Sequence, residues 1–109
     1  MEEKTKEIEL VIRGVNEKLE IRQLTFGEYH DIMREVTQTT VSTSGKPNVQ
    51  MDFGKMQELV ILKCLVKAPF EISLANIKKL PRADGERLYN EINQYNIIPE
   101  LEKETSDGQ

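Results

Sequence analysis

Several residue types on which small proteins often rely are scarce in this chain. It has no tryptophan, a single cysteine (Cys64) and a single histidine (His30) among its 109 residues. One cysteine excludes an internal disulfide framework. A zinc site needs about four nitrogen, sulfur or oxygen ligands, so no metal site is expected. We expect His30 to be structural or solvent-exposed, and Cys64 to act as a small buried hydrophobic residue.

Positive charge and phosphate-binding loops are also lacking. The chain has 15 Lys and Arg against 19 Asp and Glu, a net charge of −4, which disfavours binding to nucleic-acid phosphates. The glycines are isolated, and none falls in a G-x-G-x-x-G or G-x-x-x-x-G-K pattern. Acidic residues such as Asp84 and Glu86 are expected on the solvated surface. We therefore expect no enzyme activity, no cofactor and no nucleic-acid partner; a Cys64–His30 nucleophile pair is the alternative that stays open.

No stretch has the length and apolar character of a membrane segment. The first residues, MEEKTKEIE, carry no apolar signal-peptide core. The most apolar stretch, FGKMQELVILKCLVK, is shorter than the about 20 residues that a spanning helix needs. We expect a cytoplasmic protein without a membrane partner. Its length favours one globular domain over residues 1–99, followed by a disordered polar tail over 100–109.

Two stretches of alternating apolar and polar residues predict a β-hairpin at the N-terminus. Ile8, Leu10 and Ile12 lie on one face of the first stretch, and Leu19 and Ile21 on one face of the second. The turn residues GVNE at positions 14–17 separate them. An isolated hairpin is marginally stable in water, so this one must pack on the helices or on a partner.

The first helix has a clear start signal. Thr25 and Glu28 have the spacing of a capping box, in which the side-chain oxygen of each residue accepts a hydrogen bond from the free backbone N–H of the other. The helix should run to about Thr37, with an apolar stripe at three- and four-residue spacing. The stripe consists of Phe26, Tyr29, Ile32, Met33 and Val36.

The stretch Phe53–Lys67 predicts a central helix. Asp52 stands at its N-cap position, and Pro69 disfavours helical conformation in the residue before it. The apolar side chains lie nearly all round the axis, so the helix must be buried on most sides by its own domain or by a partner. Its surplus apolar surface is the predicted partner-binding site. The residues of that site are Phe53, Met56, Leu59, Val60 and Lys63.

Between these two helices, Gln38–Gln50 (QTTVSTSGKPNVQ) has no helical period and many small polar residues. We predict a mobile loop here. Unstructured loops of this length are uncommon in compact domains, so the segment is either a plain linker or one that orders on a partner. Its Thr and Val content leaves a third interpretation, a strand that pairs with another chain.

Two further helices complete the predicted fold. Ser73 can cap a short helix over Leu74–Leu80, and a last helix beginning near Pro81 should end near Asn96. The fold class is therefore α+β: a small N-terminal β-hairpin packed on a domain of about four helices.

The order of these features resembles the tail assembly chaperones of long-tailed bacteriophages and prophages. The resemblance rests on LT-x-x-E-Y, which begins at Leu24 and opens the first helix, and LP-x-x-D-G-x-x-L, which begins at Leu80. It extends over Glu7–Asn96 and implies a protein without catalytic activity. It also implies that the chain binds the aggregation-prone tape measure protein, assists tail tube assembly and forms homo-oligomers in the host cytoplasm.

Two other classes remain as alternatives. A structural virion or adaptor protein would stay in the finished particle, whereas an assembly chaperone leaves before completion. A small DNA-binding regulator would need a basic face and salt-sensitive binding. The tape measure protein, with the tail tube protein as a second client, is the partner that the resemblance implies.

Overall fold

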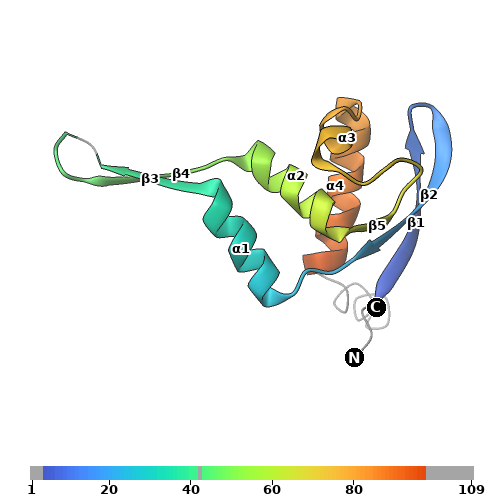
Figure 1. Cartoon of the computed structure of the whole chain (residues 1–109), viewed down its shortest axis with the longest axis horizontal. Coiled ribbons are helices and arrows are strands. Elements are labelled where there is room, and N and C mark those ends of the chain that lie inside the picture. Colours follow the sequence, from blue (N-terminus) through green and yellow to red (C-terminus); the bar gives the residue numbers. More distant parts are fainter. Residues whose placement is uncertain (1–3, 42, 98–109) are drawn as a thin grey trace, which may run out of the picture.

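The computed structural model describes residues 4–41 and 43–97, and it confirms an α+β fold with an N-terminal hairpin and four helices (Figure 1). The predicted tail over 100–109 lies outside the described residues. In chain order, the elements are β1 (Thr5–Ile12), β2 (Val15–Arg22), α1 (Phe26–Val36), β3 (Thr37–Val41), β4 (Pro47–Met51), α2 (Phe53–Cys64), β5 (Leu65–Lys67), α3 (Leu74–Lys78) and α4 (Arg82–Ile97).

The β1–β2 hairpin has a tighter turn than predicted. Ile12 pairs with Val15, so only Arg13 and Gly14 form the turn, with φ angles of 51° and 82°. Two positive φ values are what a type I′ turn requires, and its twist matches that of the flanking strands. The predicted turn over 14–17 was wrong because this two-residue turn lets the strand pairing continue through Val15.

Asp84, in the first turn of α4, holds the β1–β2 turn in place. Its side chain is buried, with 6% of the residue exposed, so the prediction of a solvated carboxylate was wrong. The carboxylate accepts a hydrogen bond from the Arg13 backbone N–H at 2.8 Å and another from the Arg87 guanidinium. The Arg13 side chain donates to the Lys79 carbonyl at 3.2 Å. These bonds fix the tip of the hairpin to the start of α4 and offset the positive φ of Arg13.

The central helix α2 is shorter than predicted. It begins as expected, because the Asp52 carboxylate accepts a hydrogen bond from the Lys55 N–H at 3.0 Å. It ends at Cys64, and Leu65–Lys67 form β5, which pairs with the free edge of β2 in a sheet of order β1-β2-β5. The predicted helix is wrong over these three residues because the strand satisfies backbone groups of β2 that would otherwise lie unpaired at a sheet edge.

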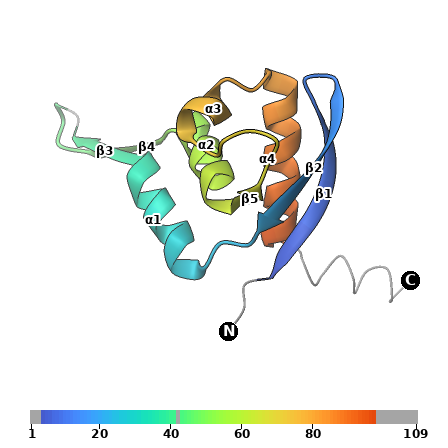
Figure 2. The same cartoon turned by 45° about the vertical axis from the view of Figure 1, so that its right-hand side comes forward.

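The core lies between the three-stranded sheet and the helices (Figure 2). Helix α4 packs on β1 and β2, and α2 contacts α1, α3 and α4. Helix α3, capped by Ser73 as predicted, ends at Lys78, two residues before the predicted end at Leu80. The most deeply buried side chains are Leu19, Ile21, Val36, Cys64, Leu88 and Ile92.

A second hairpin, β3–β4, occupies the segment where an unstructured loop was predicted. Its five antiparallel pairs run from Thr37↔Met51 to Val41↔Pro47, and it projects away from the helices (Figure 1). We call this hairpin, residues 37–51, the arm. The prediction was wrong because each strand finds its partner within the same chain. The Asp52 N–H also bonds the Val36 carbonyl at 2.9 Å and closes the base of the arm.

We predict that Asp84→Ala lowers the free energy of unfolding by about 1–3 kcal/mol, because the Arg13 N–H and the Arg87 guanidinium lose their shared acceptor. Urea denaturation measures the change. Glu86→Ala is the matched control, since Glu86 is exposed and pairs only with the exposed Arg82 on the same helix. Equal stability of the two variants would contradict the anchoring role of Asp84.

We predict that replacing residues 38–50 by a short Gly-Ser linker leaves the melting temperature of the monomer nearly unchanged. Val41 and Val49 in the arm are exposed, so the replacement removes no core contact, and a loop of different length costs little to close. Thermal unfolding followed by circular dichroism at about 5 µM, a dilution that keeps any stabilisation by association small, tests this. A large drop in melting temperature would mean that the arm supports the helical core.

Candidate partner-binding groove

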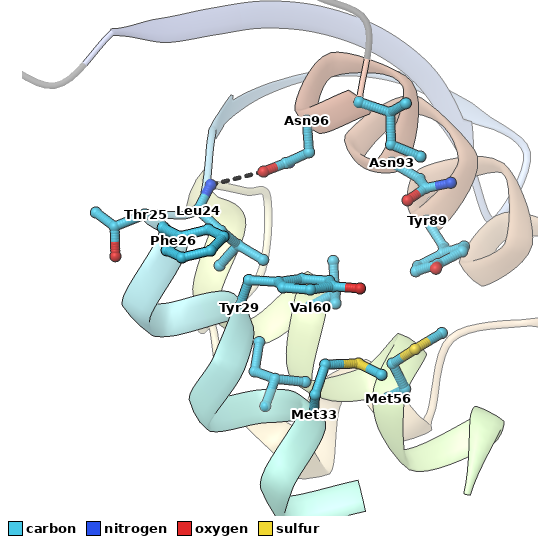
Figure 3. A pocket seen from close by; sticks show the side chains of 12 residues that line it. Leu24, Thr25, Phe26, Tyr29, Met33, Met56, Val60, Tyr89, Asn93 and Asn96 are labelled. Atoms are coloured by element: carbon cyan, nitrogen blue, oxygen red, sulfur yellow. Dashed lines mark hydrogen bonds between the residues drawn. The ribbon is translucent and has the colours of Figure 1, made fainter. Parts of the chain in front are cut away.

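An apolar groove of about 450 Å³ lies between α1 and α4, with α2 as its floor (Figure 3). It exists because α1 and α4 each pack closely on α2 and pack on each other far less. Helix α2 contributes Met56 and Val60 to the floor. Side chains that a third helix would cover in a closed bundle therefore face solvent.

The α1 wall comes from the apolar stripe of the first helix. The stripe was predicted correctly, but the structure divides it between two environments. Ile32 and Val36 are buried in the core, whereas Phe26 is 79% exposed and Tyr29 is 48% exposed at the rim of the groove. Exposed aromatic residues of this size at the edge of an apolar cleft are typical of binding surfaces.

The α4 wall is formed by side chains at three- and four-residue spacing. Tyr89, Asn93 and Asn96 follow one face of the helix, and Ile97, which is 67% exposed, lies at its end. Burial raises the pKa of the Tyr89 hydroxyl, with a smaller contribution from Tyr29. Figure 3 shows these two rings on opposite walls of the groove. The groove thus offers amide and hydroxyl groups at its rim and apolar side chains within.

None of the groove-lining residues is charged, although 31% of the chain's residues are. Met33 and Met56 lie near one another at one end (Figure 3). Methionine side chains are flexible and polarizable, and they adapt to partners of different shape. The lining therefore suits an apolar protein segment and offers no ionic anchor for a charged one.

Hydrogen bonds close the other end of the groove, where the segment from β2 to α1 meets the last turn of α4. The Leu24 N–H donates to the Asn96 side-chain oxygen at 2.6 Å, and the Gln23 side chain donates to the Tyr95 carbonyl at 3.0 Å. The Asn96 side-chain nitrogen donates to the Ile92 carbonyl at 2.9 Å. These bonds set the distance between the two walls.

An ion pair beside this junction orients α1. The Arg22 guanidinium donates two hydrogen bonds to the Glu28 carboxylate, at 2.8 and 2.9 Å, and Glu28 also accepts from the Thr25 N–H in the predicted capping box. The Arg22 hydrogen bonds, followed by the one from Thr25, lower the pKa of Glu28 from 4.5 to about 2. The start of α1 is thereby bound to the end of β2.

The structure brings only part of the predicted partner-binding site together. Met56 and Val60 line the groove, whereas Leu59 and Lys63 line a separate shallow depression between α1 and α2. Phe53 is exposed at the start of α2 and lines neither. The α1 and α4 walls were missed. The three- and four-residue spacing of Tyr89, Asn93 and Asn96 indicates that they share one face of a helix. Nothing in the sequence indicates that α1 and α4 stand apart.

The two candidates for nucleophilic chemistry lie in different environments: Cys64 in the core and His30 beside an exposed aromatic ring on α1. Cys64 is fully buried, as predicted, and burial raises the pKa of its thiol to about 11, so it stays protonated at neutral pH. The His30 ring packs on Phe26 with ring centroids 4.0 Å apart. Within residues 4–41 and 43–97, no group of three or more His, Cys, Asp or Glu side chains is placed to hold a metal ion.

Fold and groove together define a small α+β domain with an uncharged, apolar groove on its surface. No protein-family model matches the sequence, and neither a curated protein nor a solved structure is significantly similar to it. In the part of the chain that the structure describes, none of the helices has the length and apolar character required to cross a membrane.

The lowered pKa of Glu28 predicts an acid-dependent loss of stability. Because the folded state favours the ionised carboxylate, this stabilisation is complete above about pH 4.5 and is lost as the pH falls toward 2. We expect Arg22→Gln to destabilise the protein at pH 6 and to flatten the decline over this range, measured by urea unfolding at several pH values. Arg34→Gln, which breaks the exposed pair with Asp31 on the same helix, is the control and should keep the wild-type profile.

Proposed function

We propose that this protein is a phage or prophage tail assembly chaperone that binds a helical segment of the tape measure protein in the groove between α1 and α4. The observation that supports this proposal is the uncharged, methionine-lined groove with Phe26, Tyr29 and Ile97 exposed at its rim. The resemblance of the LT-x-x-E-Y and LP-x-x-D-G-x-x-L segments to this family supplies the biological context.

The proposed binding mode is that of a helix in a groove. An amphipathic helix presents apolar side chains at three- and four-residue spacing, which an apolar cleft removes from water. Asn93 and the Tyr29 hydroxyl can accept or donate hydrogen bonds at the edge of such a helix. Binding of this kind requires no catalysis, and the tail tube protein is a second client in this proposal.

We predict that Phe26→Ser weakens client binding at least about tenfold, as expected for an exposed aromatic anchor at an apolar interface. Phe53→Ser is the matched control, because Phe53 is equally an exposed aromatic at the start of a helix but lies outside the groove. Fluorescence anisotropy with a labelled amphipathic peptide from the tape measure protein of the same genome gives the affinities. Circular dichroism checks that both variants fold.

A larger loss with Phe53→Ser than with Phe26→Ser would place the client on the outer end of α2 instead. Unchanged binding by both variants would contradict the groove as the client site. Mass spectrometry of purified particles separates the two main classes: a chaperone is absent from finished particles, whereas a virion or adaptor protein is present. Salt-sensitive binding to a DNA duplex would favour the regulator.

A further inference from the structure

The arm has one apolar and one polar face. Thr39 pairs with Val49 and Val41 with Pro47, and directly paired residues share a face that alternates along each strand. Val41, Pro47 and Val49 therefore lie on one face, and Gln38 and Gln50 on the other. Val41 is 72% exposed and Val49 is 64% exposed, so the body of the protein does not cover this apolar face.

The arm also lacks the charges that usually protect an exposed sheet edge. Lys46 is the only charged residue between Thr37 and Met51, in a chain of which 31% is charged. Charged residues or proline normally protect edge strands from association. Here Lys46 and Pro47 lie together at the tip, so the rest of the two strands has no such protection. An isolated two-stranded hairpin is also marginally stable alone. Both features indicate a hairpin that is completed by a contact.

The groove between α1 and α4 has the same uncommon character. Its lining is free of charge, with apolar side chains within and the amides of Asn93 and Asn96 along one wall. The apolar face of the arm, with Val41 and Val49, carries no charge into this lining, and the Thr side chains beside them find hydrogen-bonding groups at the rim. A charged segment of this chain placed in the groove would bury a charge for which the lining offers no partner of opposite charge.

The arm of one copy does not reach the groove of the same copy. β3 follows α1 without an intervening residue, and Asp52 alone separates β4 from α2. The Asp52–Val36 hydrogen bond continues the ladder into this junction. The arm therefore projects away from the helices in both views (Figures 1 and 2), and only a second molecule can bring an arm to the groove.

We propose that the arm docks with Val41 and Val49 in the α1–α4 groove of a second copy of the chain, and that two copies exchange arms reciprocally. Reciprocal exchange closes the assembly, because each copy supplies one arm and one groove. The inference requires only a second copy and does not rest on the chaperone function. If both hold, client and arm compete for one groove, and client binding releases the arm.

Sedimentation velocity on the full chain tests this inference. We expect the wild type to be dimeric at about 100 µM, and Val49→Asp to raise the dimer dissociation constant at least about tenfold. Gln50→Asp is the matched control on the opposite face of the same arm and stays dimeric. On the groove side, Phe26→Asp should weaken the dimer similarly. Asp is favourable in the first turn of α1, so this variant is expected to fold.

A mixing experiment identifies which surfaces meet. Val49→Asp retains an intact groove and Phe26→Asp an intact arm, so the mixture should form a heterodimer with one of the two contacts although each variant alone is monomeric. The exchange is overturned if the wild type is monomeric or if either variant remains dimeric. It is also overturned if Gln50→Asp has the same effect as Val49→Asp, or if the mixture forms no heterodimer. If the protein is monomeric and Phe26→Ser still loses peptide binding, the arm exchange is excluded and the chaperone proposal is unaffected.

Discussion

The packing of three helices on α2 is the constraint on which the rest of the structure depends. Val60 and Ile61 are buried on neighbouring faces of this helix, and Cys64 is fully buried at its end. Both α1 and α4 pack on α2. Because this packing holds each helix in place separately, the space between α1 and α4 stays open. The same helix is therefore part of the core on one side and the floor of the groove on the other.

Two polar connections keep this arrangement in register. Asp84 binds the tip of the β1–β2 hairpin to the start of α4, and Asn96 binds the end of that hairpin segment to the last turn of α4. The hairpin thus lies along the whole of α4. Buried polar groups of this kind are costly when unpaired, so they favour one alignment of sheet and helix over shifted ones. The two motifs that carry the family resemblance include residues of these connections, among them Leu24 and Asp84.

Among the described residues, the groove and the arm hold five of the ten exposed large hydrophobic side chains, and Val11, Val15, Phe53, Val66 and Leu74 lie elsewhere. Phe26 and Ile97 border the groove, and Val41 and Val49 form one face of the arm. Both areas are nearly free of charge in a chain that is otherwise rich in it. Exposed apolar surfaces of this kind are typical of sites of contact with another protein.

Local patterns in the sequence determined the hairpin, the helix starts and the apolar stripes. Alternation defined β1 and β2, and the capping side chains of Thr25, Asp52 and Ser73 marked helix starts, because these signals act between residues close in the chain. Burial of Cys64 also followed from its apolar neighbours.

Only the tertiary structure decided the features that depend on distant segments. The end of α2 at Cys64 depends on the free edge of β2, and the burial of Asp84 depends on a turn 71 residues away. The strands of the arm depend on each other, and the groove depends on α1 and α4 standing apart on α2. The sequence by itself shows apolar side chains nearly all round the stretch Phe53–Lys67 and along one stripe of the first helix. Packing decides where that apolar surface remains exposed, because side chains of one stripe, such as Val36 and Phe26, enter the core or face the groove according to which helix lies opposite.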